Sequence, residues 1–124
     1  MKVEIRFRNV ERSEQLAQFA ERQASAAFDR FAPVVSRVVV RIADVNGPKG
    51  GEDKVCRVLV KTHGFGSLIV RQRDQTVGGA LAVAFGRASR TLGGMIERKR
   101  TRRPAGPRFE DGQLRDIRGT MIVA

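Results

Sequence analysis

Hydrophobic and charged residues alternate strictly from Lys2 to Arg8. A period of two is typical of a strand that is buried on one face. The same alternation returns over 37–42, 56–61 and 67–73. The sequence therefore predicts four strands, with turn-rich segments between the last three of them.

Two longer segments have the 3.6-residue period of amphipathic helices. In the first, apolar residues recur over 16–31 and Ser13 is placed to cap the helix. In the second, they recur from residue 77 to about residue 100, with Asp74 or Thr76 as the candidate cap. Hydroxyl and carboxylate side chains at these positions can accept hydrogen bonds from the free amides of a first turn.

The element order β-α-β-β-β-α indicates an α/β fold of the two-layer α+β sandwich type. A right-handed β-α-β crossover makes the first two strands parallel, and short turns make the next pairs antiparallel. Both helices would cover one face of a four-stranded mixed sheet, and the other face would be left to solvent or a partner. We expect one α/β domain over 1–103. The scattered apolar residues of 104–124 indicate a flexible C-terminal tail.

Composition narrows the protein class. The 124 residues carry 24 Lys plus Arg against 13 Asp plus Glu, a formal net charge of +11. A polyanion is the partner that this excess favours. The longest apolar runs are too short to span a bilayer, and the N-terminus lacks the apolar stretch of a signal peptide. With Cys56 as its single cysteine, the protein is expected in a reducing cytoplasm.

Strand parity collects positive charge on the face opposite the helices. The period of two sends nine cations to that face, opposed there only by Glu4: Lys2, Arg6, Arg8, Arg37, Arg41, Arg57, Lys61, Arg71 and Arg73. Such a face is either a solvated surface or a binding surface. Unpaired like charges on neighbouring strands destabilise a sheet, so a partner is a real alternative to solvent.

A second concentration of charge lies on the last helix. Arg87, Arg90 and Arg98 fall along one flank at 100° per residue. Five cations then follow within six residues: Arg98, Lys99, Arg100, Arg102 and Arg103. A helix dipole accounts for one or two cations at a C-terminus, whereas this number favours phosphate binding. Without Trp or Tyr for base stacking, recognition of folded RNA by charge and shape is the better match.

Candidate catalytic and metal-binding residues are few. His63, Ser67 and Asp74 can be combined into a triad only on paper, because no motif supports them. Cys56 shares strand parity with core valines, which predicts packing rather than reactivity. The glycine-rich run 47–51 lacks the P-loop pattern, and one Cys with one His gives no zinc spacing. We expect a protein that is not an enzyme and needs no cofactor or metal.

Several segments resemble the ribosome hibernation promoting factor family, also called ribosome-associated inhibitors, protein Y or sigma-54 modulation proteins. They are Asn9-Val10-Glu11 after the first strand, the helix over 16–31, Arg37 to Val40, and above all 44–56. The resemblance covers about 1–103. It implies a β-α-β-β-β-α fold similar in shape to double-stranded RNA-binding domains.

The resemblance also implies a function: docking on the small ribosomal subunit through 16S ribosomal RNA near the decoding centre. There the protein would block mRNA and tRNA and silence translation under stress. Basic residues on both helices carry RNA contacts in that family. The matching positions here are Arg22, Arg30, Arg87, Arg90, Arg98, Lys99, Arg100, Arg102 and Arg103.

The chain departs from the family pattern in three places. Gln23 and Ala26 stand near positions where the family has lysines, and Asp74-Gln75-Thr76 lacks the usual aromatic. About 20 residues after Arg103 cannot form the dimerisation domain of the long members, so a monomer or weak homodimer is expected. We expect no DNA specificity and no membrane partner.

Two points stay open from the sequence. One is which basic surface makes the main contact. The other is whether the protein is instead a regulatory protein-binding module of the sigma-factor modulation type, using Val39, Leu59 and Ile69 on the open sheet face.

Overall fold

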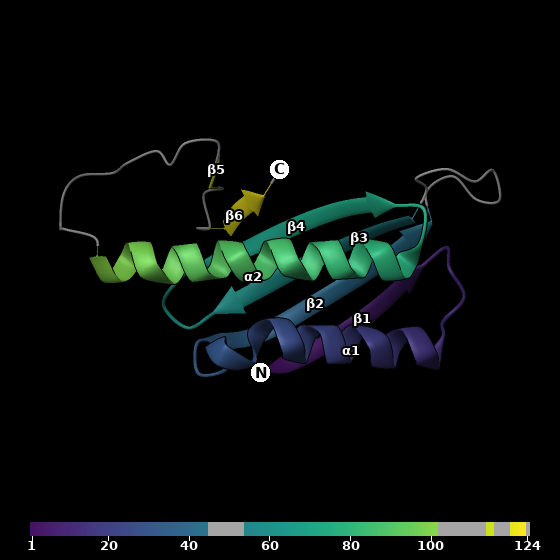
Figure 1. Ribbon diagram of the computed structural model, residues 1–124, viewed down its shortest axis with the longest axis horizontal. Coiled ribbons are helices and arrows are strands. Elements are labelled where there is room, and N and C mark those ends of the chain that lie inside the picture. The colour runs from purple at the N-terminus through teal and green to yellow at the C-terminus, as the bar shows by residue number, and fades with distance from the viewer. Residues whose placement is uncertain (45–53, 102–113, 116–119, 124) are drawn as a thin grey trace.

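The computed structural model of the chain describes residues 1–44, 54–101, 114–115 and 120–123 (Figure 1). The strands are β1 (Lys2–Arg8), β2 (Val35–Asp44), β3 (Lys54–Thr62), β4 (Ser67–Asp74), β5 (Leu114–Arg115) and β6 (Thr120–Val123). The helices are α1 (Glu14–Phe28) and α2 (Val77–Thr101), and a short 3-10 turn, η1 (Asp29–Phe31), follows α1. Neither α1 nor α2 is long and apolar enough to span a membrane.

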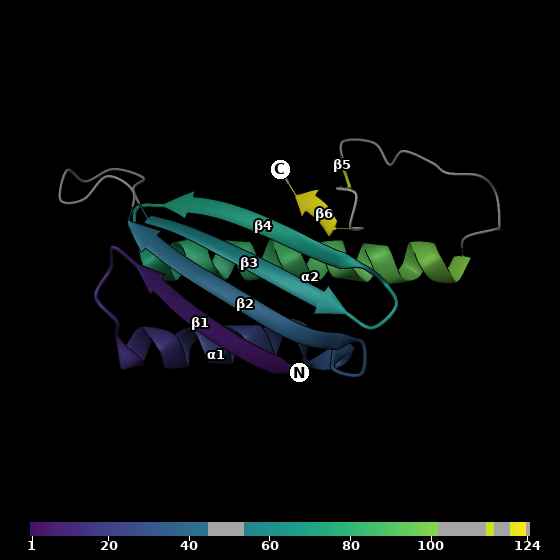
Figure 2. The ribbon, with the colours of Figure 1, turned by 180° about the vertical axis from the view of Figure 1, so that it is seen from behind.

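The pairing of the first four strands confirms the predicted topology. β1 pairs with β2 in parallel, while β2 with β3 and β3 with β4 are antiparallel. Both helices lie on one side of the sheet, and the view from behind shows the strands in front of them (Figure 2). The fold is therefore the two-layer α+β sandwich that the patterning indicated, with one open sheet face.

The predicted count of four strands is wrong. The sheet has six strands in the order β1-β2-β3-β4-β6-β5, because β6 adds in parallel to the edge of β4. Met121 of β6 is fully buried in the core and stands beside Leu68 of β4. Within the segment 104–124, predicted as a flexible tail, residues 114–115 and 120–123 form β5 and β6, while 104–113, 116–119 and 124 lie outside the described residues. The flexibility of this segment stays a prediction. The boundary predicted at residue 103 stays a prediction.

Side-chain hydrogen bonds begin both helices at the predicted residues. Ser13 Oγ accepts a hydrogen bond from the Leu16 amide at 3.3 Å. At the start of α2, Thr76 Oγ1 accepts from the Gly79 amide at 3.0 Å, and Asp74 Oδ1 accepts from the Gln75 amide at 2.6 Å. Each of these bonds satisfies an amide that the helix or its entry turn leaves free.

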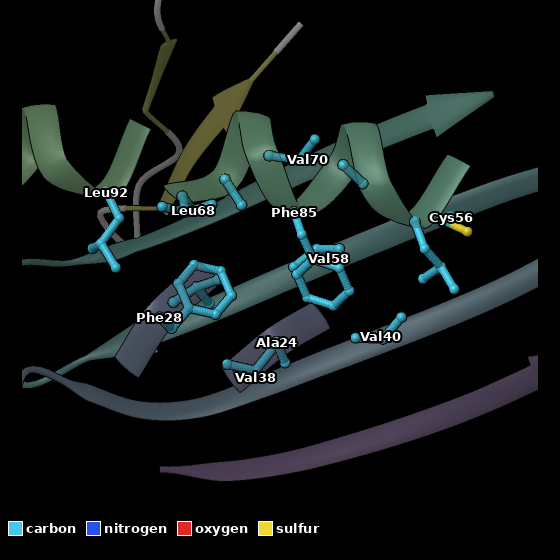
Figure 3. Close-up of a cluster of buried hydrophobic side chains, with 14 of the residues drawn as sticks. Ala24, Phe28, Val38, Val40, Cys56, Val58, Leu68, Val70, Phe85 and Leu92 are labelled. Carbon is cyan, nitrogen blue, oxygen red and sulfur yellow. The ribbon is translucent and has the colours of Figure 1, made fainter. Parts of the chain in front are cut away.

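The core lies between the sheet and the two helices (Figure 3). Phe28 of α1 meets Phe85 of α2 edge to face, with ring centroids 6.0 Å apart. The inward residues of the central strands are all fully buried beneath them: Val38, Val40, Ile42, Cys56, Val58, Val60, Leu68 and Val70. This burial confirms the predicted strand parity. The alternate residues of the same strands therefore lie on the open face of the sheet.

Candidate nucleic-acid interface

Strand register aligns four arginines across the open face of the sheet. Arg6 stands beside Arg41, Arg41 beside Arg57, and Arg57 beside Arg71. We call these four residues the arginine row. Neighbouring strands are about 4.8 Å apart, so the row places four guanidinium-bearing side chains within roughly 14 Å across β1 to β4.

One end of the arginine row is neutralised within the protein. Glu4 accepts a hydrogen bond from Arg37 at 2.8 Å and pairs with Arg6 at 2.5 Å. The hydrogen bond from Arg37, together with that from Arg6, holds the pKa of Glu4 below its ordinary value. Glu4 thus supplies the counter-charge for Arg6 and Arg37 at the β1 end of the sheet.

The rest of the arginine row has no counter-charge in the described part of the chain. The guanidinium groups of Arg41, Arg57 and Arg71 form no ion pair and no hydrogen bond with any described residue. Like charges on directly opposed strand positions repel each other. An anionic partner would remove that repulsion, whereas solvent only screens it.

An apolar row runs beside the arginine row. Val39, Leu59 and Ile69 are paired across β2, β3 and β4, and Ile122 of β6 continues the line. We call these four residues the apolar row. Ile122 is 48% exposed. A hollow of about 170 Å³ between the two rows is lined by Val39, Arg41, Arg57, Leu59 and Ile69.

The remaining predicted cations of the open face flank these two rows. Lys2, Arg37 and Lys61 are paired in a line across β1, β2 and β3. Arg8 and Arg73 are exposed at the other end of the strands. The register thus brings together the cations that strand parity assigned to this face. Their role in binding stays a prediction.

The cations of α2 do not converge on one patch. Arg87 Nη1 donates to the Arg71 carbonyl oxygen at 3.2 Å and to Gln72 Oε1 at 2.8 Å. β6 pairs with β4 only as far as Val70. Arg87 therefore covers the stretch of the β4 edge that β6 leaves free. Lys99 Nζ instead donates to the Gly64 carbonyl oxygen and lies 5.1 Å from the Phe65 ring centroid.

Arg30 occupies the boundary between η1 and α2. Its Nη2 donates to Ser89 Oγ at 3.3 Å, and its guanidinium carbon lies 4.5 Å from the Phe31 ring centroid. Ser89 Oγ in turn donates to the Ala27 carbonyl oxygen at 3.0 Å. Arg30 therefore helps to join the two helices, and its predicted RNA contact would have to share this side chain.

The other predicted helix cations differ in their accessibility. Arg22 of α1 and Arg90 of α2 are exposed and form no ion pair or hydrogen bond with a described residue. Arg98 is half-buried. Arg100 lies within α2, but its side chain is outside the described set, as are Arg102 and Arg103 entirely. Among the helix cations whose side chains the structure describes, Arg22 and Arg90 are thus the most available to a phosphate.

The residues considered for catalysis are not brought together. His63 lies in the turn before Ser67, while Asp74 ends β4, about 24 Å along the strand from Ser67. Cys56 is buried as predicted, and burial raises the pKa of its thiol to about 12, with the charge of Asp74 adding to the shift. Among the described residues, no three His, Cys, Asp or Glu side chains form a metal-ligating group.

Sequence reasoning missed two contributors to the open face. Ile122 falls in the segment predicted as a tail, although the alternation of this exposed residue with the buried Met121 is a local sign of a strand. The alignment of four arginines was also missed, because parity selects a face but only the register between strands selects a row.

No family model matches the sequence, and comparison with curated proteins gives no significant match. Solved structures do match. The N-terminal domain of protein Y from Thermus thermophilus superposes with a TM-score of 0.63 at 19% identity, over 74% of this chain and 96% of that one. A ribosomal subunit interface protein from Coxiella burnetii gives a TM-score of 0.67 at 13% identity, over 78% of this chain and 99% of that one. These matches confirm the fold that the resemblance implied. The likeness to double-stranded RNA-binding domains stays a prediction.

Proposed function

We propose that this protein associates with the ribosome. It would dock on the small subunit through 16S ribosomal RNA near the decoding centre and inhibit translation by occupying the path of mRNA and tRNA. The observation that carries the proposal is the shared fold, which extends over 96% of the protein Y N-terminal domain and over 99% of a protein named for the ribosomal subunit interface.

The distribution of charge supports RNA as the contact. The net charge of +11 is large for 124 residues, and each phosphate that a cation neutralises releases counterions. Arg22 and Arg90 present free guanidinium groups on the helix layer, each able to hold a phosphate through two parallel hydrogen bonds. Five further cations follow in the sequence over 98–103.

The mechanism needs no covalent step. Contacts to phosphates position a protein on RNA without reading its sequence. A two-layer domain with a packed core is rigid enough to exclude mRNA and tRNA sterically once it is held in their channel. Inhibition would then follow occupancy, so it would reverse as the protein dissociates.

The test is co-sedimentation with purified small subunits over a salt series. A helix variant, Arg22→Glu with Arg90→Glu, is compared with a sheet variant, Arg57→Glu with Arg71→Glu, which changes the net charge equally. Binding of the unmodified protein should weaken as salt rises, with a log–log slope of about −0.7 to −0.9 per phosphate contacted. The helix variant should bind at least about tenfold more weakly, with a shallower slope.

The outcomes are distinct. Absence of co-sedimentation at every salt concentration would overturn ribosome association. Loss of binding in the sheet variant alone would leave association standing but would overturn docking through the helix layer. Circular dichroism of both variants checks that they are folded, which we expect because all four arginines are exposed.

A further inference from the structure

The open sheet face offers two kinds of surface side by side. The arginine row and the apolar row are two residues apart along each strand, about 6.8 Å, and each row crosses four strands. The hollow between them is walled by residues of both rows. A ligand that fits this face must satisfy positive charge along one side and cover aliphatic surface along the other.

RNA would use only half of such a surface. Phosphates could pair with Arg41, Arg57 and Arg71, but bases bind flat aromatic or guanidinium surfaces. The described residues of this face include no aromatic side chain, since the phenylalanines of the described chain lie in the core, the helix layer or a turn. The apolar row would stay largely hydrated under RNA.

A protein segment with acidic and aliphatic side chains would use both rows. An amphipathic helix presents an apolar stripe at positions i, i+3, i+4 and i+7, and a flanking stripe can be acidic. Positions i to i+7 span about 10.5 Å, and a helix is roughly 10–12 Å wide. Each row spans about 14 Å, so one helix laid across the strands can contact both rows at once.

We propose that the open sheet face binds an acidic amphipathic helix of a partner protein. Its aliphatic stripe would lie on Val39, Leu59, Ile69 and Ile122, and its carboxylates would pair with Arg41, Arg57 and Arg71. The bound carboxylates supply the counter-charge that the described part of the chain does not. Because this face lies on the other side of the sheet from the helices (Figure 2), the proposal is independent of the RNA contacts proposed above.

The probe is a synthetic helical peptide of about 18 residues, five turns, with Leu along one stripe and Glu along the neighbouring stripe. Its fluorescence anisotropy is measured against the full chain. A matched peptide in which Gln replaces Glu removes the charge, and a second peptide with the same composition in scrambled order removes the stripes. We expect the patterned peptide to bind at least about tenfold more tightly than either control.

Variants of the protein locate the site. Arg57→Glu with Arg71→Glu should weaken the patterned peptide at least about tenfold, because each reversal replaces an attraction with a repulsion. Leu59→Thr with Ile69→Thr should weaken it without changing net charge. Arg22→Glu with Arg90→Glu carries the same charge change as the first variant but should leave peptide binding unaltered.

Three results would overturn the proposal. The first is equal binding of the patterned and scrambled peptides, which would mean attraction to net charge alone. The second is equal weakening by the helix variant and the sheet variant. The third is a short RNA that binds more tightly than the peptide and loses its binding in the Arg57→Glu, Arg71→Glu variant, which would make the open face an RNA surface.

Discussion

Replacing Met121 with alanine tests whether β6 is an integral part of the fold. Met121 is fully buried in the core and is paired with Leu68 of β4. Truncating a buried methionine to alanine costs about 2–5 kcal/mol, from lost transfer free energy and the cavity that remains. With about 2.1 cal/mol/K of unfolding entropy per residue, a chain of 124 residues loses roughly 4 °C in Tm per kcal/mol. The expected decrease in Tm is therefore about 8–19 °C.

The assay is urea and thermal unfolding of the full chain followed by circular dichroism. Ile122→Ala is the matched control, because Ile122 belongs to the same strand but is 48% exposed, and we expect it to cost less than about 1 kcal/mol. Midpoints for Met121→Ala and Ile122→Ala that agree within error would refute the docking of β6. If the free energy of unfolding falls with urea concentration at the same slope in both variants, the difference lies in stability rather than in the compactness of the folded or unfolded state.

Other predictions follow from single side chains. Cys56, whose pKa is raised to about 12, should resist a thiol reagent at pH 8 and react once urea unfolds the chain; rapid modification of the folded protein would contradict its burial. Thr76→Ala should cost about 0.5–2 kcal/mol of stability by removing the cap of α2, and an unchanged urea midpoint would contradict the capping role. The pKa of Glu4 is lowered by the hydrogen bond from Arg37, so its stabilisation is present above the ordinary value of 4.5 and lost as pH falls through the folded value. Glu4→Gln should flatten the pH dependence of stability in that acidic range, and an unchanged profile would mean that this pair adds nothing.

Local patterning was sufficient for the elements that bury one face. Alternation placed β1 and the cores of β2, β3 and β4, and the 3.6-residue period placed α1 and α2. These signals are strong because each element has its own apolar stripe. The topology of the first four strands then followed from connection lengths and the handedness of the crossover.

β6 could not be predicted in the same way. Its four residues are too few for a periodic signal, and its pairing with β4 is parallel and therefore non-local. The decisive condition is the free edge of β4, which exists only after the sheet has formed. The place of Ile122 in the apolar row could not be predicted either, because it depends on the pairing of β6 with β4.

The sequence predicts which face of the sheet or helix carries each candidate residue, but it does not predict which residues those side chains contact. Parity assigned Arg57 and Arg71 to the open face, but their alignment with Arg41 depends on the register of three strands. On α2, helical angle placed Arg87 on a flank. The distance to the β4 carbonyl, which decides that Arg87 is engaged, depends on where the helix lies over the sheet.

We propose that this protein sits on the small ribosomal subunit with its helix layer against RNA. A cryo-electron microscopy map of the protein mixed with purified small subunits is the decisive experiment. We expect density for the two-layer domain in the channel near the decoding centre, with Arg22 and Arg90 within hydrogen-bonding distance of phosphates and the arginine row turned away from RNA. Subunits without the added density, or a domain whose open sheet face rests on RNA, would contradict it.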